Sequence, residues 1–281
     1  MTRHKIIIEA NSKNANYWKD LWNYRGLFYF LSWRDVLVRY KQTVIGVLWS
    51  VLRPLITIVI FTVVFNKLGD FSADGGVPYA IMVCAGMLPW QFFSNAFSES
   101  ANSLIANSNL LTKVYFPRLI VPASSVIVSI IDFFISFIIL IGLFIFYQYS
   151  PGWKIIYLPV FLLLATITAM GSGLFISALN VKYRDFRYII PFIVQFGLYV
   201  SPVGFSSSMV YGSEKIPMAV KYIYSMNPMV GVIDGFRWAI LGGQVNLFMP
   251  GFIISVFVSL FLLFYGIYYF RKTERGFADI I

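Results

Sequence analysis

The sequence predicts an all-α membrane protein, and three observations carry this prediction. Hydrophobic residues make up 59% of the 281 residues and charged residues only 12%, about half the charged share of a typical soluble domain. Five clear apolar stretches and one interrupted stretch approach the length of about 20 residues that a helix needs to cross a bilayer. Short basic clusters separate these stretches, which is the pattern of membrane topology.

The N-terminal region, residues 1–42, is predicted to be cytoplasmic and to contain an amphipathic helix over Tyr17–Leu31. Large aromatic and aliphatic residues recur there at helical spacing, with Lys19, Asp20 and Arg25 between them. Such a helix is suited to lying in the membrane interface. A soluble helix packed on a partner would show the same pattern.

Six membrane-spanning helices are predicted within residues 43–270, which form one transmembrane domain. Arg53 and Pro54 interrupt the first of them, because a proline inside a helix removes a backbone hydrogen bond. We favour a membrane-embedded part that begins near Arg53, with Tyr40–Leu52 in the cytoplasmic interface, over a kink that shapes a pore entrance. The expected spans are Val44–Phe65, Tyr79–Ala101, Leu119–Tyr147, Ile155–Leu179, Ile189–Phe205 and Gly251–Phe270.

The segment 206–250 is too long for a simple turn and too apolar for a free loop. It contains two short helical patterns, Ile216–Tyr224 and Gly231–Leu241. Pro228 stands where the second helix would start, and Gly242 where it would end. Helices of this length do not span a bilayer, so we expect them to dip back into the outer leaflet. A helical cap on the outer face is the alternative.

Both termini, including the tail 271–281, are predicted to be cytoplasmic. In that orientation most of the 22 Lys and Arg residues face the cytoplasm, as the positive-inside rule requires. The first thirty residues also lack the charged start, apolar core and cleavage site of a signal peptide.

The residue types of common catalytic and metal sites are scarce. His4 and Cys84 are the one histidine and the one cysteine, so no disulfide within the chain and no zinc or haem site is expected. Without a Gly-Lys dipeptide the chain has no P-loop, and we expect it to bind no cofactor. The net charge of +10 comes with no nucleic-acid-binding signature. A membrane enzyme whose carboxylates are brought together by folding is the alternative from another class.

Asp132 lies midway along the third predicted span. A carboxylate at that depth costs about 2.5–3.5 kcal/mol on insertion scales and is usually paired or lines a wet cavity. We expect Asp132 to face the bundle interior, protonated or paired with a basic group such as Arg53. A purely structural hydrogen bond is the alternative.

Four strings follow one another from about residue 33 to 240, nearly the whole membrane domain. They are WRDVLVRYKQTVIGVLWSVLRPL (Trp33–Leu55), PWQFFSNAFSESANSLIANSNLLTKVYFPRLIVP (Pro89–Pro122), VKYRDFR (Val181–Arg187) and NPMVGVIDGFR (Asn227–Arg237). In this order they resemble the motifs of permeases of type-2 ATP-binding-cassette exporters, specifically those for O-antigen, capsule or teichoic-acid polymers. Ile45, where leucine is usual, is a small departure.

The resemblance implies an inner-membrane permease without catalytic residues. It implies a homodimer bound to two copies of a separate P-loop ATPase, which would bind ATP and Mg. A lipid-linked polysaccharide, O-antigen first, would pass through a channel at the dimer interface. A type-2 exporter of small molecules is the nearest rival, and the complete second string and the absence of a large extracellular domain speak against it.

Three groups of candidate site residues follow from the predicted topology and the resemblance. The ATPase-coupling group comprises Asn107, Leu110, Leu111, Lys113, Arg118, Lys182 and Arg184. The translocation-pathway group comprises Trp49, Arg53, Trp90, Phe92, Phe93, Phe97 and Asp132. The periplasmic-gate group, placed by the resemblance, comprises Pro217, Asn227, Pro228, Asp234 and Arg237. Solvated loops are the alternative for the first group, and plain packing is the alternative for each aromatic residue of the second.

Overall fold

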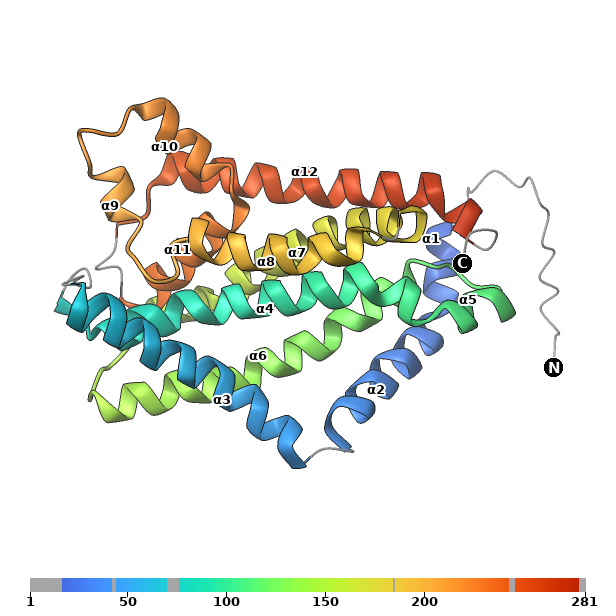
Figure 1. Ribbon diagram of the computed structural model, residues 1–281, viewed down its shortest axis with the longest axis horizontal. Helices are drawn as coiled ribbons and strands as arrows, with labels where there is room; N and C mark the ends of the chain where they lie inside the picture. Colours follow the sequence, from blue (N-terminus) through green and yellow to red (C-terminus); the bar gives the residue numbers. More distant parts are fainter. Residues whose placement is uncertain (1–16, 42–43, 70–75, 184, 243–245, 278–281) are drawn as a thin grey trace.

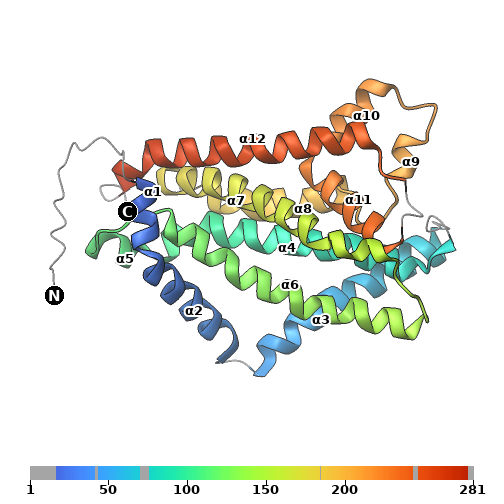
Figure 2. The ribbon, with the colours of Figure 1, turned by 180° about the vertical axis from the view of Figure 1, so that it is seen from behind.

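The computed structural model describes residues 17–41, 44–69, 76–183, 185–242 and 246–277. Within these ranges the chain is helical and has no strand, which confirms the all-α prediction. The helices run back and forth along one long axis (Figure 1). The end of α12 and η4 lie at the same end of the bundle as α1, and the segment between α8 and α12 lies at the opposite end (Figures 1 and 2).

Five candidate membrane spans follow from helix length and apolar composition. Two of them combine an α-helix with a neighbouring π-helix or 3-10 helix. The spans are Val51–Leu68, from α3 (Val44–Phe61) and the π-helix η1 (Thr62–Leu68); α4 (Tyr79–Ala106); α6 (Ile120–Phe146); Trp153–Lys182, from the 3-10 helix η3 (Trp153–Tyr157) and α7 (Leu158–Lys182); and α12 (Met249–Thr273). That the embedded part begins near Arg53 stays a prediction.

Helix α4 forms the centre of the bundle. It is the most buried of the five spans: 83% of its most apolar window is buried, against 11% for Val51–Leu68 and 22% for α12. Helices α6, α7, α11 and α3 pack around it. Neighbouring helices therefore enclose α4, whereas α3 and α12 present side chains to the surroundings.

Helices α7 and α12 approach each other closely at two glycines. A methyl group on Gly171 would collide with the backbone of Leu262 and Leu263, and one on Gly266 would collide with the carbonyl oxygen of Gly171. Small residues at such crossings allow helix backbones to touch, which drives helix association in a bilayer. Thr168 Oγ1 also donates to Ser259 Oγ at 2.9 Å across the same interface.

Replacing Gly266 with alanine is expected to lower the stability of the bundle by about 2 kcal/mol, because overpacking forces the two backbones apart. Gly142 on α6 is the matched control, since nothing lies within 4 Å of a methyl group placed there. Gly142→Ala is expected to be neutral or to stabilise by up to about 1 kcal/mol through helix propensity. Thermal unfolding of both variants in mild detergent tests this, and equal midpoints would contradict it.

The N-terminal helix is longer than predicted. Tyr17–Leu31 is helical as expected, but it forms α1 (Tyr17–Asn23) and α2 (Arg25–Lys41), with a turn at Tyr24. Helix α2 packs against α6. Helices α2 and α3 together form a V whose point, where α2 ends and α3 begins, is directed away from the bundle (Figure 2).

The predicted fifth span, Ile189–Phe205, is helical only in its first part. Helix α8 (Phe186–Val200) has 15 residues, or about 22 Å, which is shorter than a hydrocarbon core of about 30 Å. It ends because Pro202 follows Ser201, and a residue before proline prefers an extended backbone. Ser201 has φ −89° and ψ 150°.

The short helices expected between the last two spans are confirmed as helices. They are α10 (Met218–Ser225) and α11 (Pro228–Ile240), preceded by the single turn α9 (Ser208–Tyr211). Asn227 caps α11 by accepting from the Met229 N–H at 3.1 Å, and Pro228 is its first residue, as predicted. Helix α11 is almost entirely buried against α12, α4 and α7.

Candidate functional site

Residues 201–207, which we call the buried loop, connect α8 to α9 without regular structure. Ser201, Val203 and Ser207 are all buried. A buried non-helical backbone is tolerated in a membrane protein only when other groups satisfy its N–H and C=O groups. Side chains from α4 and α11 supply these partners.

Arg237 of α11 provides the largest share of the contacts. Its side chain is 1% exposed, and it donates from Nη2 to the Val203 carbonyl at 2.8 Å and from Nη1 to the Phe205 carbonyl at 2.7 Å. Its Nε donates to the Met82 carbonyl of α4 at 3.3 Å. Gly86 leaves room for it, since a methyl group there would lie 3.0 Å from Nη2. One guanidinium therefore ties α11, α4 and the buried loop together.

Other side chains complete the attachment of the buried loop. Asn227 Nδ2 donates to Ser201 Oγ at 2.9 Å, and Ser207 Oγ donates to Asp234 Oδ1 at 2.7 Å. The Tyr79 hydroxyl, at the start of α4, donates to the Gly204 carbonyl.

Three of the predicted gate residues, Asn227, Asp234 and Arg237, thus converge on the buried loop. Pro228 begins the helix that carries two of them. Pro217 does not join this group, because it lies exposed just before α10.

Helix α10 is held against the start of α12 by its own polar contacts. Lys221 Nζ donates to the Tyr211 carbonyl at 2.6 Å, and the Tyr211 hydroxyl hydrogen-bonds Ser225 Oγ at 2.9 Å. Ser255 Oγ of α12 donates to the Ser225 carbonyl at 2.9 Å. Burial raises the pKa of the Tyr211 phenol to about 12, so that it stays protonated at neutral pH.

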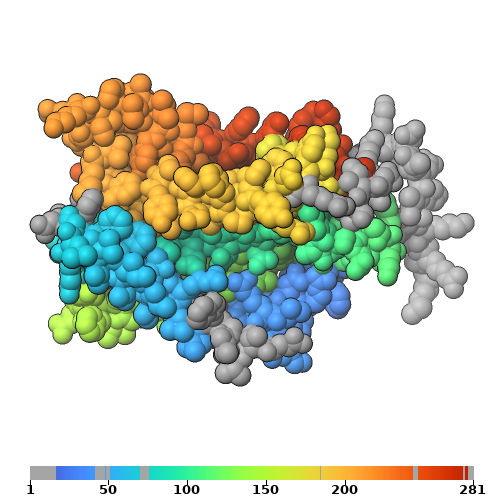
Figure 3. All heavy atoms as spheres, viewed as in Figure 1, coloured from blue at the N-terminus to red at the C-terminus, as the bar shows by residue number. Residues whose placement is uncertain are grey.

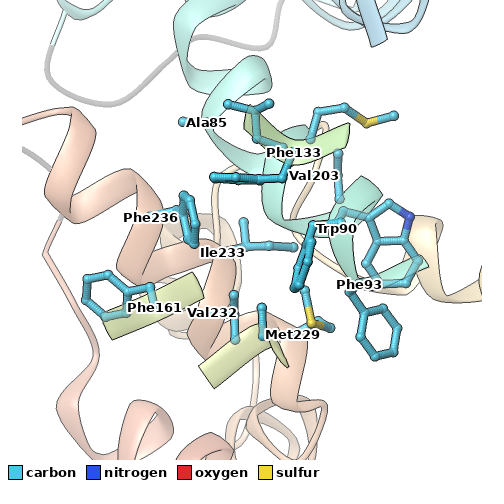
Figure 4. Close-up of a cluster of buried hydrophobic side chains, with 14 of the residues drawn as sticks. Ala85, Trp90, Phe93, Phe133, Phe161, Val203, Met229, Val232, Ile233 and Phe236 are labelled. Carbon is cyan, nitrogen blue, oxygen red and sulfur yellow. The ribbon is translucent and has the colours of Figure 1, made fainter. Parts of the chain in front are cut away.

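The aromatic residues predicted for the translocation pathway lie inside the single chain. Trp90, Phe92, Phe93 and Phe97 of α4 are all buried. Figure 4 shows Trp90 and Phe93 among side chains of α11 and the buried loop, in the same cluster as Phe133. In this arrangement they pack the core. Trp49 belongs to α3, but its side chain is outside the described part of the chain.

Helix α8 presents a different set of aromatic residues on its surface. Four aromatic side chains recur at helical spacing and are all more than half exposed: Tyr188, Phe192, Phe196 and Tyr199. The face drawn in Figure 3 carries α8 and α3 with part of α4 between them. Arg53 of α3 is also exposed. The exposed surfaces of α3 and α8 are therefore open to a lipid or a partner.

The expected pairing of Asp132 with Arg53 is wrong, because Arg39 of α2 is the basic partner. Arg39 Nη2 lies 2.7 Å from Asp132 Oδ2, and Arg39 Nη1 lies 3.2 Å from Glu99 Oε1 of α4. The Tyr40 hydroxyl donates to Asp132 Oδ1. Asp132 is buried and faces the bundle interior as predicted. The pairs fasten the amphipathic helix α2 to α6 and α4.

Five of the seven predicted ATPase-coupling residues lie in or beside α5 (Ser108–Lys113), and the group differs in exposure. Leu111 is buried, whereas Lys113 and Lys182 are exposed and Leu110 is half-buried. Asn107, before α5, accepts from Arg34 Nη2 at 2.8 Å. Two residues complete the group: Arg118 is half-buried and contacts the C-terminal end of the chain, and Arg184 is outside the described residues.

Sequence reasoning missed the residues whose partners are remote in the chain. Arg39 lies within the first motif, yet it is 93 positions from Asp132, and no local pattern links them. Tyr79 and Ser207 look like ordinary boundary and loop residues. Pro202 was the one available signal for the early end of α8 and the start of the buried loop, because a proline predicts an extended residue before it.

The ABC-2 type transporter family matches residues 26–241 of the chain. The chain is similar to the O-antigen export system permease protein RfbA of Klebsiella pneumoniae, with 26% identity over 88% of this chain and 92% of that protein. It is also 26% identical to RfbA of Myxococcus xanthus, over 94% of this chain and 98% of that protein. The capsule polysaccharide export inner-membrane protein CtrC of Neisseria meningitidis serogroup B is 24% identical, over 93% and 96% respectively.

Proposed function

The chain belongs to the ABC-2 type transporter family, and on this premise we propose that it exports a lipid-linked polysaccharide, O-antigen first. It is a multi-pass inner-membrane permease and not an enzyme. The observation that carries the proposal is the similarity, nearly end to end, to permeases named for O-antigen export. The likeness to CtrC makes capsule polysaccharide the second candidate cargo.

In the proposed topology both termini are cytoplasmic and the chain crosses the membrane six times. The fifth crossing consists of α8 and the buried loop, whose carbonyls are satisfied by Arg237 and Tyr79. Helices α10 and α11 re-enter from the outer side as the gate. The burial of α11 inside the bundle supports this assignment, since a cap on the surface would leave one face of the helix exposed. Residues 1–42 and 271–281 form the cytoplasmic parts.

Two copies of the chain form the proposed channel. The exposed faces of α3 and α8 lie on one side of the molecule (Figure 3), and Leu55, Ile56, Val59 and Ile60 of α3 are among the exposed apolar residues. The row from Tyr188 to Tyr199 on α8 gives this side flat rings that stack on sugars without reading one linkage. In this proposal α8 supplies the lining, in place of the core residues Trp90, Phe92, Phe93 and Phe97.

The ATPase is a separate subunit that binds ATP and Mg and docks at the end of the bundle that carries α5. Lys113, Val114 and Tyr115 are exposed there, and Lys182 is exposed at the end of α7. Exposed apolar side chains beside lysines suit a protein surface better than bulk water. The motion driven by ATP hydrolysis would reach the spans through α5 and α2.

Deletion of this chain in its native host tests the proposed cargo. Lipid-linked polysaccharide is expected to accumulate at the cytoplasmic face and to vanish from the surface, and a plasmid copy of the wild-type chain is expected to restore it. Fractionation of O-antigen and capsule after deletion distinguishes the two cargo candidates. Unchanged surface polysaccharide of both kinds would contradict the proposal.

A further inference from the structure

Three segments that are far apart in the sequence meet at the end of the bundle that carries α5. They are the start of α1, the connection between α5 and α6, and the 3-10 helix η4 (Glu274–Gly276) that follows α12. We call the side chains of Tyr17, Arg118, Glu274 and Phe277 the terminal clasp. Tyr17, Glu274 and Phe277 are buried.

Glu274 makes a bond to each of the other two segments. The Tyr17 hydroxyl donates to Glu274 Oε2 at 3.0 Å, and Arg118 Nη1 donates to the Glu274 backbone carbonyl. Burial, and after it the nearby Glu274 carboxylate, raises the pKa of the Tyr17 phenol well above its ordinary value. The phenol therefore stays protonated and keeps donating at neutral pH. The Arg271 guanidinium lies 4.5 Å from the centroid of the Tyr17 ring, in a cation–π contact.

Phe277 fixes the same connection by packing. Its ring lies 5.5 Å from the Phe270 ring, edge to face, and the Arg118 guanidinium lies 5.9 Å above it. It belongs to one apolar cluster with Leu111 of α5 and Phe116 of the connection. Phe277 thus shares a buried apolar cluster with Leu111 of α5, while Lys113, Val114 and Tyr115 are exposed.

We infer that the terminal clasp holds α5 and residues 114–119 in the orientation that receives the ATPase, with Glu274 and Phe277 as positioning residues. This inference rests on the proposed function, because it assigns the partner of the exposed surface. A tail that served only as a solvated topology signal would not bury a glutamate and a phenylalanine against α1 and α5. A buried carboxylate that receives a hydroxyl hydrogen bond is costly to disturb, which makes the contact a specific one.

The test uses the full chain with its ATPase in lipid nanodiscs and two nearly isosteric changes, Tyr17→Phe and Glu274→Gln. Thr112→Cys on α5, carrying a benzophenone-maleimide, reports the position of α5 by photo-cross-linking to the ATPase. The native Cys84 is fully buried and is not expected to compete. Tyr29→Phe, at an exposed tyrosine of α2, is the matched control.

Each single change is expected to lower the cross-linking yield and ATP-driven export about fivefold to tenfold, because Tyr17→Phe removes the buried hydrogen bond and Glu274→Gln leaves it without a charged acceptor. The thermal midpoint is expected to fall by no more than about 2–4 °C, and the KM for ATP is expected to stay near the wild-type value. The double variant is expected to be no worse than either single variant, since both act through one hydrogen bond. Tyr29→Phe is expected to match the wild type.

Unchanged cross-linking in both variants would overturn the inference, as would effects that simply follow a lowered thermal midpoint. Failure of the proposed function has a different signature, because the wild-type chain would then yield no cross-linked ATPase and no export. If the wild-type chain cross-links and exports and the variants do so equally well, only the role of the terminal clasp is refuted.

Discussion

Replacing Arg237 with methionine is expected to abolish export and to destabilise the end of the bundle that carries α9, α10 and α11. The change leaves the carbonyls of Val203, Phe205 and Met82 without their present donor. Each buried group left unsatisfied costs about 1–3 kcal/mol, so a loss of about 3 kcal/mol or more is expected in total. The buried loop would then be free to leave its place between α4 and α11. Thermal unfolding in detergent and surface polysaccharide measure the two effects.

Arg187→Met is the matched control for Arg237→Met. It makes the same chemical change on α8, where the side chain is exposed, and is expected to alter stability by less than about 0.5 kcal/mol. Lysine at position 237 is expected to restore part of the stability, because an ammonium can still donate to one carbonyl but lacks the fork that reaches three. An Arg237→Met chain that folds and exports normally would refute the role assigned to the buried loop.

Replacing Arg39 with methionine is expected to destabilise the chain by about 2 kcal/mol and to reduce export at least tenfold. The loss comes from Asp132, whose side chain is 7% exposed and would be left without its cation. We place the cost below the usual value for a fully buried pair, because Arg39 itself is 34% exposed. Without this pair, α2 loses a bond to α6 and also the bond to Glu99 of α4. Stability and export of the purified variant measure the effect.

The double variant Arg39→Met with Asp132→Asn separates the effect of the unpaired charge on stability from the effect of the lost contact on export. If the single change harms the chain through an unpaired buried charge, neutralising Asp132 is expected to recover most of the stability. Export is expected to stay low, since α2 is still unfastened from α6. Arg25→Met, at an exposed arginine of the same helix, is expected to behave like the wild type. Full recovery of export in the double variant would mean that the Arg39–Asp132 pair serves stability alone.

The helices were predictable because their signals are local. Apolar length located the five helices that are long enough to span a membrane, and the Asn227-Pro228 pair correctly placed the start of α11, since capping depends on residues a few positions apart. The early end of α8 could have been read from Pro202, but the apolar run that continues beyond it predicted a longer helix. The backbone of the buried loop can depart from a helix because side chains of α4 and α11 donate hydrogen bonds to its carbonyl groups. Sequence spacing cannot show that.

The partners of polar residues were less predictable than the residues themselves. Asp132 was expected to be buried and paired, and it is, but its partner lies on α2 and not on α3. Glu274 and Tyr17 are 257 positions apart, so nothing in either local pattern indicates their contact. The choice of channel-lining aromatics from α4 came from residue type alone. Exposure, which only the packed structure provides, favours α8 instead.

Gentle purification of the tagged chain from its native host tests the central claim most directly. The account predicts a complex that contains a P-loop ATPase in equimolar amount and hydrolyses ATP. A chain that purifies alone under mild conditions, without a nucleotide-hydrolysing partner, would contradict the account and favour a membrane enzyme.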